Sequence, residues 1–287
     1  MVWFGSGLSI LGAIGAIVSW YGLKSIPILI GCVVLLIAGV VIVFINTKYM
    51  DGRPKGWLSS PNVLARRPGT GWLMFFVGVI VFALLAINLK ANGPLLNFDT
   101  SVSNTLHTTA LSVSKGTLAL LNGGWYLGNE AAIVLSLLMG LYFIIKRYWQ
   151  EFWMVFAGNV GAPLLFLATS HIFNRHRPVF AVPVEHTLSG PGFPSGHCVI
   201  AVTCYGLLAY LLLPRIKSGF GKFMVIAIAL LIILFIGFSR VFVGGHYPTD
   251  AVAGFALGLA WAGVAYTTIE RHYAHRNERK IDNEKAG

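Results

Sequence analysis

Long apolar segments recur along almost the whole chain and are separated by short polar stretches. Eight of them reach or approach the roughly 20 residues that a helix needs to cross the hydrocarbon core of a bilayer. They lie at about residues 5–23, 26–46, 70–90, 126–145, 152–171, 196–213, 223–241 and 248–268. Because a helix pairs its backbone groups internally, this pattern predicts an all-α, polytopic membrane helix bundle.

The first two apolar segments are separated by a tight turn that contains Lys24 and Pro27. The first segment lacks a basic region before it and is followed at once by another span, which indicates a retained helix rather than a cleaved signal. We therefore predict three regions. They are an N-terminal transmembrane hairpin with a cytoplasmic loop (1–69), a six-helix core (70–268) and a basic cytoplasmic tail (269–287).

Residues 91–125 form the longest stretch without a predicted span. Apolar residues recur there at steps of three to five, with Ser and Thr between them. They are Phe98, Val102, Leu106, Ala110, Val113 and Leu118. This pattern predicts an amphipathic helix that lies along the membrane surface or packs over the bundle, as a docked helix rather than a substrate gate.

Composition agrees with a membrane protein, because 56% of the residues are hydrophobic and only 11% are charged. The net charge is +11, but the basic residues fall mainly in short loops and the tail. This distribution favours membrane topology and anionic lipid headgroups over nucleic acid as a partner. The three cysteines, Cys32, Cys198 and Cys204, lie in apolar surroundings and indicate neither a disulfide framework nor a metal site. The sequence does not indicate whether the protein forms oligomers.

The loops richest in Lys and Arg all fall on one side of an eight-span topology. By the positive-inside rule that side is cytoplasmic. The polar segments 91–125, 172–195 and 240–248 then lie together on the extracytoplasmic face of a bacterial-type cytoplasmic membrane. Polar groups at the ends of spans are costly unless they act in function, so these segments are candidates for a site.

The first candidate motif is Pro194-Ser195-Gly196-His197, at the start of a span. The unpaired N–H groups of a helix N-terminus bind anions, and glycine allows a close approach. Ser195 adds a hydroxyl donor, and His197 is able to protonate a leaving oxygen. An N-cap followed by an interfacial histidine is the alternative interpretation.

The second motif runs from Ser239 to Asp250. His246 and Asp250 are four residues apart and share a face of a helix. The carboxylate is able to hold one imidazole N–H and leave the other nitrogen as a nucleophile. Arg240 supplies a fork of donors for phosphate oxygens.

A third basic element is Arg175-His176-Arg177-Pro178. Arg177, which the following proline holds in extended backbone, is the stronger phosphate ligand. Arg175 is a further candidate, although its position suits a snorkelling side chain. No carboxylate cluster of metal-binding type accompanies these motifs, so we expect neither a metal nor another cofactor. The combination indicates phosphoryl transfer through a phosphohistidine, with arginines neutralising the charge.

These motifs resemble those of the type 2 phosphatidic acid phosphatase (PAP2) superfamily of integral-membrane lipid phosphate phosphatases. Pro194–His197 and Ser239–Asp250 match two of its three blocks in full. The resemblance spans about residues 70–268 and implies that His246 attacks phosphorus, Asp250 orients it and His197 acts as acid and base. It further implies that the phosphate is held by four residues: Arg177, Ser195, Gly196 and Arg240.

The first block departs from the family pattern, because Ser170 stands where a lysine is expected. The loss of a charge-assisted phosphate contact costs about 1.5–3 kcal/mol. Arg175 or His171 is able to supply the phosphate contact that the absent lysine would make. A weaker enzyme, an altered substrate preference and a pseudoenzyme remain open.

We therefore expect a metal-independent phosphatase of a lipid phosphate or pyrophosphate. By resemblance, the candidate substrates are undecaprenyl pyrophosphate, phosphatidylglycerol phosphate and phosphatidic acid. The alternatives are a phosphotransferase to a lipid or sugar acceptor and a non-catalytic lipid-binding protein.

Overall fold

The computed structural model describes residues 63–182 and 190–286. The chain divides into two units, Met1–Pro54 and Lys55–Gly287, and all the described residues belong to the second. The predicted spans at 5–23 and 26–46 lie outside the described residues.

Every regular element in the described ranges is helical. The elements are α3 (Val63–Arg66), α4 (Pro68–Lys90), α5 (Leu95–Ser112), α6 (Lys115–Gly128), α7 (Glu130–Ile145), α8 (Trp149–Phe156), the π-turn η2 (Ala157–Gly161), α9 (Ala162–Phe173), α10 (Gly196–Leu212), the 3₁₀ turn η3 (Leu213–Arg215), α11 (Gly219–Phe242) and α12 (Pro248–Ala286). Six stretches are long and apolar enough to cross a membrane: Pro68–Lys90, Lys115–Ile145, Trp149–Phe173, Gly196–Arg215, Gly219–Phe242 and Pro248–Arg276. These helices confirm the predicted all-α membrane bundle.

One predicted boundary is wrong. Residues 115–125 were expected to belong to the non-spanning stretch, but they form most of α6, which continues through Asn129 into α7 as one apolar length. Glycines explain the difference. A Cβ on Gly124 would meet the side chain of Ser239, and one on Gly128 would lie 3.1 Å from Cβ of His197. The glycines and Asn make this segment look like a loop, yet the small residues allow α6 to pack closely against α10 and α11.

Local signals set several helix ends. Pro68 opens α4, where a missing N–H costs nothing. The side chains of Ser114 and Ser218 cap α6 and α11 by accepting backbone N–H groups three residues ahead. Asn174, in the left-handed conformation with φ 44°, ends α9. The chain then leaves the bundle through a non-helical segment, 174–182.

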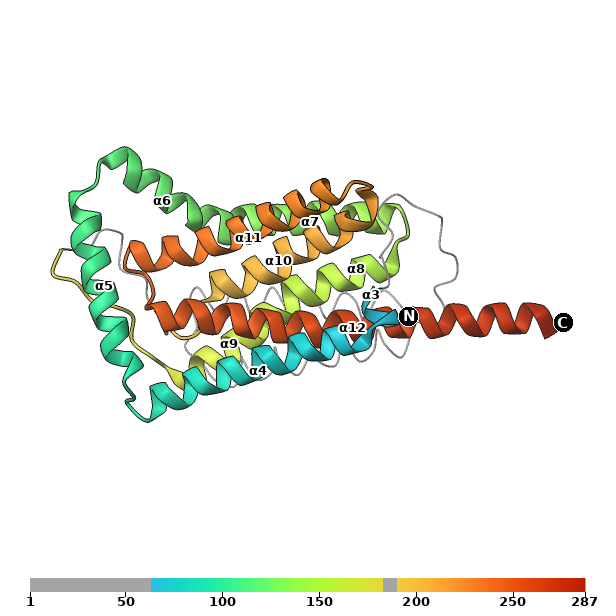
Figure 1. Ribbon diagram of the computed structural model, residues 1–287, viewed down its shortest axis with the longest axis horizontal. Coiled ribbons are helices and arrows are strands. Elements are labelled where there is room, and N and C mark those ends of the chain that lie inside the picture. Colours follow the sequence, from blue (N-terminus) through green and yellow to red (C-terminus); the bar gives the residue numbers. More distant parts are fainter. Residues whose placement is uncertain (1–62, 183–189, 287) are drawn as a thin grey trace. The chain divides into compact units, whose positions relative to one another are not determined.

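Helix α5 crosses the end of the bundle and contacts α4, α11 and α12 (Figure 1). This confirms a docked helix, and part of the expected apolar face packs inward, where Leu106 and Ala110 contact the cluster of Phe242 and Val243. Other inward positions are polar. Phe98 is 53% exposed, whereas the polar residues Asp99, Ser103 and His107 are buried. The helix therefore turns its polar side toward the ends of the spans, where polar groups gather.

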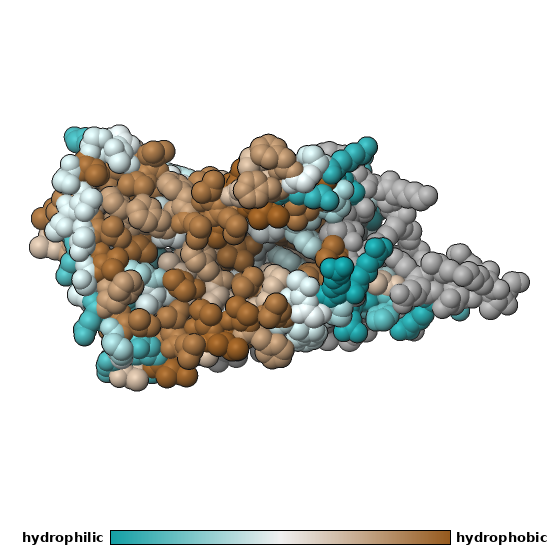
Figure 2. Space-filling model, in the orientation of Figure 1, coloured by the Kyte–Doolittle hydropathy of each residue, from teal (hydrophilic) through white to brown (hydrophobic). Residues whose placement is uncertain are grey.

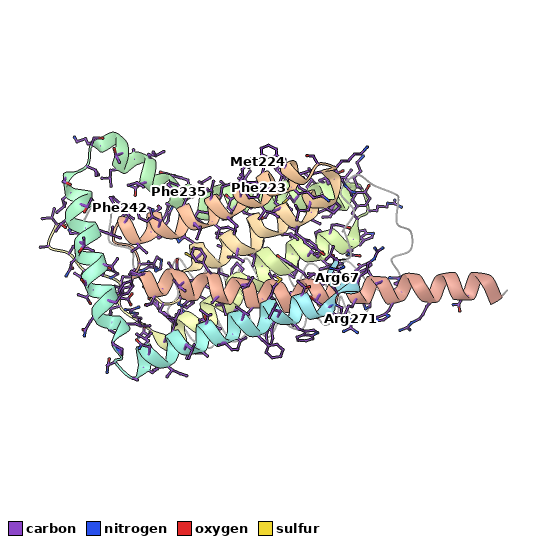
Figure 3. The ribbon with its side chains drawn as sticks, viewed as in Figure 1. Arg67, Phe223, Met224, Phe235, Phe242 and Arg271 are labelled. Carbon is purple, nitrogen blue, oxygen red and sulfur yellow. The ribbon has the colours of Figure 1, made fainter. Side chains whose placement is uncertain are left out.

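Apolar side chains form a belt around the middle of the bundle, between more polar ends (Figure 2). Large hydrophobic residues of α4, α7 and α11 are exposed in this belt, as expected of a surface in contact with lipid tails. Figure 3 marks the two ends: Phe242 lies next to α5, and Arg67 and Arg271 lie toward the opposite end.

Candidate active site

Three segments meet at the end of the bundle that α5 crosses, two of them close together in the sequence and the third about fifty residues further on. They are the segment 174–182, the residues 190–195 before α10 and the turn 243–247 between α11 and α12. Backbone hydrogen bonds join them. The N–H of Gly192 donates to the carbonyl of Arg175 at 2.7 Å, and the N–H of Ser195 donates to the carbonyl of Asp250 at 2.9 Å.

His246 lies in the turn between α11 and α12 and is 1% exposed. Its Nδ1 lies 2.8 Å from the carbonyl oxygen of Gly192, and its Nε2 lies 2.9 Å from Nη1 of Arg177. A carbonyl only accepts and a guanidinium only donates, so Nδ1 carries the proton and Nε2 the lone pair. The nitrogen able to attack phosphorus therefore lies directly beside a candidate phosphate ligand.

The charge state of His246 follows from its surroundings. Burial lowers the pKa of this imidazole well below its ordinary value, and the positive charge of Arg177 lowers the pKa further. The hydrogen bond to Gly192 opposes both effects without outweighing them. The ring is therefore neutral, which is the state that a nucleophile requires.

Asp250 lies beside His246 but does not hold its N–H directly. Oδ2 of the carboxylate is 3.7 Å from Nδ1, which instead donates to Gly192. Oδ2 accepts the backbone N–H of Tyr247 at 2.8 Å, and Oδ1 accepts from Arg175 at 2.6 Å. The carboxylate is thus fixed too far away to hydrogen-bond the imidazole. Its negative charge still stabilises positive charge on the ring by electrostatic attraction.

His197 and Ser195 present polar atoms without protein partners. Oγ of Ser195 and Nε2 of His197 are buried and make no hydrogen bond with the described residues. Because buried polar atoms normally have a partner, these two indicate a ligand that supplies one. The rings of His197 and His246 are 6.4 Å apart between centroids, a separation that allows both to contact one phosphate.

Gly196, at the first position of α10, is required for a reason that the sequence did not reveal. A Cβ at this position would lie 2.9 Å from the ring of Phe166. The glycine therefore lets α10 approach α9 closely, and no side chain caps the first turn of α10. Its N-terminus remains able to bind an anion.

Arg177 and Arg240 approach the two histidines from different elements. Nη1 of Arg177 also donates to the carbonyl of Gly245 at 2.7 Å, which fixes the guanidinium beside His246. Arg240, fully buried at the end of α11, donates to Oγ of Ser239 at 3.2 Å. The two guanidinium groups place positive charge on both sides of the site.

Arg175 differs from the other arginines, because carboxylates surround its guanidinium. Nη1 lies 2.6 Å from Asp250, and Nη2 lies 2.7 Å from Asp99 on α5. These ion pairs favour a supporting role over a phosphate contact, and snorkelling does not describe the side chain. The sequence interpretation missed Asp99, although it is the only acidic residue between Asp51 and Glu130.

Trp125 of α6 is a second residue that the sequence interpretation missed. Its indole lies 4.5 Å from the ring of His197 and 5.3 Å from the guanidinium of Arg240. Its N–H donates to the carboxylate of Glu130 at 3.2 Å. The tryptophan therefore forms a wall against one side of the site.

Ser170 is fully buried near the end of α9, and its hydroxyl donates to the carbonyl of Leu167 at 2.9 Å. Its side chain is thus turned back onto its own helix. His171, the next residue, is exposed. Of the two residues considered as substitutes for the missing lysine, Arg175 is held by carboxylates and His171 lies on the surface.

Known sequences and structures with the same features identify the family. The sequence pattern of the PAP2 superfamily matches residues 131–274, half of the chain. The chain belongs to this superfamily. All the predicted phosphate-handling residues fall within the PAP2 match, whereas Asp99 and Trp125 precede it.

Relatives within the PAP2 superfamily share parts of this chain. Phosphatidylglycerophosphatase B of Bacillus subtilis (strain 168) is 36% identical over 118 residues, which are 41% of this chain and 57% of that protein. A lipid A 1-phosphatase of Rhizobium johnstonii is 42% identical over 69 residues, 24% of each protein. The chain thus spans little more than half of the first relative and a quarter of the second.

A solved PAP2 structure shares the fold. The crystal structure of a transmembrane PAP2-type phosphatidylglycerolphosphate phosphatase from Bacillus subtilis superposes with a TM-score of 0.57 and is 28% identical. It covers 66% of this chain and 94% of its own. Together with the six apolar helices, this similarity identifies a multi-pass membrane protein.

Proposed function

We propose that this protein is a membrane lipid phosphate phosphatase that acts through a phosphohistidine on His246. The observation that carries the proposal is the state of that ring, whose Nδ1–H is held by Gly192 and whose Nε2 lone pair lies beside Arg177. Membership of the PAP2 superfamily and the phosphatase names of the relatives support the activity.

The reaction has two steps. Nε2 of His246 attacks phosphorus, the bond from phosphorus to the lipid oxygen breaks, and His197 gives its proton to that oxygen. His197, now neutral, then takes a proton from water. The water oxygen attacks phosphorus, the bond from phosphorus to Nε2 of His246 breaks, and inorganic phosphate leaves. Arg177 and Arg240, with Ser195 and the N-terminus of α10, hold the phosphate oxygens, and Asp250 stabilises the positive charge on the imidazole.

Phosphatidylglycerol phosphate is the substrate that we favour among the three candidates. That substrate appears in the name of the B. subtilis relative and in that of the B. subtilis crystal structure. Undecaprenyl pyrophosphate and phosphatidic acid present the same terminal phosphate, so they belong in any test. The site lies at the end of the bundle, beyond the apolar belt that Figure 2 shows, so a headgroup bound there would leave its tails in the lipid.

We further place the site on the extracytoplasmic face of the cytoplasmic membrane. Basic residues outside the site gather at the end of the bundle opposite to α5. In the described part of the chain they are Arg66, Arg67, Lys146, Arg147, Arg215, Lys217, Lys222, Arg271, Arg276 and Arg279, against Lys90 and Lys115 at the α5 end. The positive-inside rule makes that end cytoplasmic.

The test is phosphate release by detergent-purified protein from the three lipids, with EDTA present. We expect release by the wild type and none by His246→Ala, while His176→Ala, which alters an exposed histidine nearby, keeps wild-type activity. Acid-labile phosphate on the wild-type protein, absent from His246→Ala, identifies the intermediate. Loss of activity in EDTA, or retained activity in His246→Ala, would reject the metal-independent phosphohistidine mechanism.

Two further outcomes identify the alternatives. Phosphate that appears on an added lipid or sugar acceptor rather than in solution indicates a phosphotransferase. Lipid binding that survives His246→Ala, with no release by the wild type, indicates a non-catalytic binder. Ser170→Lys addresses the departure from the family pattern, because a large gain of activity would mean that the absent lysine weakens the site.

A further inference from the structure

A buried charge network joins α5 to the start of α12, behind the nucleophile. Asp99 and Asp250 are both fully buried, and the guanidinium of Arg175 lies between them. The same guanidinium donates to Oγ1 of Thr249 at 2.8 Å and lies 4.2 Å from the ring centre of Tyr247. Arg175 therefore contacts two consecutive residues of α12, the tyrosine before that helix, and α5.

Asp99 also acts as an N-cap for α12, although it comes from another helix. Its Oδ1 accepts the backbone N–H of Thr249 at 3.0 Å, and its Oδ2 accepts the hydroxyl of the same threonine. Thr249 is the second residue of α12, where N–H groups lack partners within the helix. A carboxylate at this end is also favoured by the helix dipole. The cap fixes the turn that carries His246 and Asp250.

The charges of the network sum to −1, from two carboxylates and one guanidinium. Without the guanidinium between them, the two buried carboxylates would repel each other. The guanidinium of Arg175, which contacts both carboxylates, offsets this repulsion. One negative charge is left over, 3.7 Å from Nδ1 of the histidine that becomes positive when its other nitrogen is phosphorylated.

We infer that Asp99 and Arg175 are positioning residues of the proposed phosphatase site. Together they cap α12, hold Asp250 in place and keep its negative charge for the imidazole. This inference rests on the proposed function of His246. Neither residue belongs to the family motifs, and Asp99 lies outside the matched segment 131–274.

A charge-rescue experiment tests the inference on the full-length protein. Asp99→Asn should lower kcat by about ten- to hundredfold, with KM nearly unchanged, because the nucleophile is misplaced but the phosphate ligands remain. Arg175→Gln should lower kcat further, because it leaves two unneutralised carboxylates. Adding Asp99→Asn to Arg175→Gln restores the net charge of −1 and should recover part of the lost kcat. Asn104→Ala, on the exposed side of α5, serves as the control with wild-type kcat.

The rescue separates positioning by charge from a merely structural role. If the residues only stabilised the fold, the double variant would be less active and less heat-stable than either single variant. A double variant no more active than Arg175→Gln would overturn the inference. Wild-type kcat in Asp99→Asn would overturn the part assigned to Asp99.

A second measurement does not depend on turnover and so separates this inference from the proposed function. The midpoint of protonation of His246 is followed by NMR of protein with labelled histidine, with the signal assigned by its loss in His246→Ala. The charged and titratable groups that face this ring are Arg177, Arg240, Arg175, His197 and Asp250. Arg175→Gln should raise the midpoint, and the double variant should bring it back toward the wild type. An unchanged midpoint in Arg175→Gln would overturn the inference even if the protein released no phosphate from any lipid.

Discussion

At the level of single residues, the neutral state of His246 depends on burial and on the arginine beside it. The histidine lies between α11 and α12, and its pKa is lowered first by burial and then by Arg177. A lowered pKa means that the ring stays neutral as the pH falls through the ordinary value of about 6.5 and gains a proton only below it. We expect an NMR midpoint below 6.5 in the wild type and a higher one in Arg177→Gln. A wild-type midpoint above 6.5 would contradict this account of the site.

Trp125 is expected to hold His197 in the orientation needed for proton transfer. The indole packs 4.5 Å from that ring, and Glu130 fixes the indole through its N–H. Since general acid catalysis contributes about a hundredfold or more, a loosened His197 should lower kcat about tenfold or more. Trp125→Ala should show this loss in phosphate-release assays, and Trp125→Phe, which keeps an aromatic wall, should recover most of the activity. Equal losses in both variants would indicate that packing on His197 is not the cause.

Sequence alone locates the site at residue level only where a motif carries the information. Arg177, Ser195, His197, Arg240 and His246 stand out because polar groups at span ends are rare, and the structure gathers them.

The partners of these residues follow from packing and not from spacing along the chain. Asp99 is a polar residue next to Phe98, one of the apolar residues expected to face inward, and Trp125 lies in the stretch that was predicted not to span the membrane. The carbonyl of Gly192, rather than Asp250, holds the imidazole N–H of His246. The three residues come from elements whose contacts with the site form only in the folded bundle.

At the level of elements, α4 and α12 are held together by small residues. A Cβ on Gly78 of α4 would lie 2.7 Å from the backbone nitrogen of Ala260 and 2.8 Å from its Cβ, distances that real side chains do not tolerate. The close approach also holds in the other direction. A Cβ on Gly263 of α12 would lie 2.8 Å from the backbone nitrogen of Phe75 in α4. In lipid, where burial from water contributes little, such close packing is a main source of association between helices.

Gly78→Ala should therefore destabilise the bundle by about 1–3 kcal/mol, because the helices must separate to admit the methyl group. Gly69→Ala is the matched control, since the same helix has open space around Gly69. Alanine favours helix over glycine by about 1 kcal/mol, so the control should be neutral or slightly stabilising. Thermal unfolding in detergent measures both. A Gly78→Ala variant as stable as the control would mean that α4 and α12 do not pack as described.

Element boundaries show the same limit of sequence reasoning. The apolar spans 70–90, 196–213 and 223–241 differ from the observed helices by only a few residues, because their hydrophobicity is uniform. The span predicted from residue 126 begins instead at Lys115. Glycine and asparagine in α6 lower its hydropathy, but Gly124 and Gly128 lie where another helix touches it. A hydropathy pattern does not distinguish a polar loop from a tightly packed helix.

At the level of the whole molecule, the two ends of the bundle differ in a way that supports the proposed direction across the membrane. One end carries the site and α5 together with Lys90 and Lys115. Most of the other basic residues outside the site lie at the opposite end, where Figure 3 labels Arg67 and Arg271. The arginines at the first end do not count against this direction, because Arg175, Arg177 and Arg240 are engaged within the site. The positive-inside rule then predicts that a membrane-impermeant reagent added outside intact cells reaches only the end that carries the site.

Single cysteines at exposed positions test this direction. In a Cys32→Ala background, Asn104→Cys on α5 should react with an impermeant maleimide in intact bacterial cells, and Lys217→Cys, between α10 and α11, should react only after the cells are opened. Cys198 and Cys204 are buried and should contribute no signal. Phosphate release by each variant ensures that the labelled protein is folded. The reverse labelling pattern would place the site on the cytoplasmic face, and the lipid headgroups that it meets would then be those of the inner leaflet.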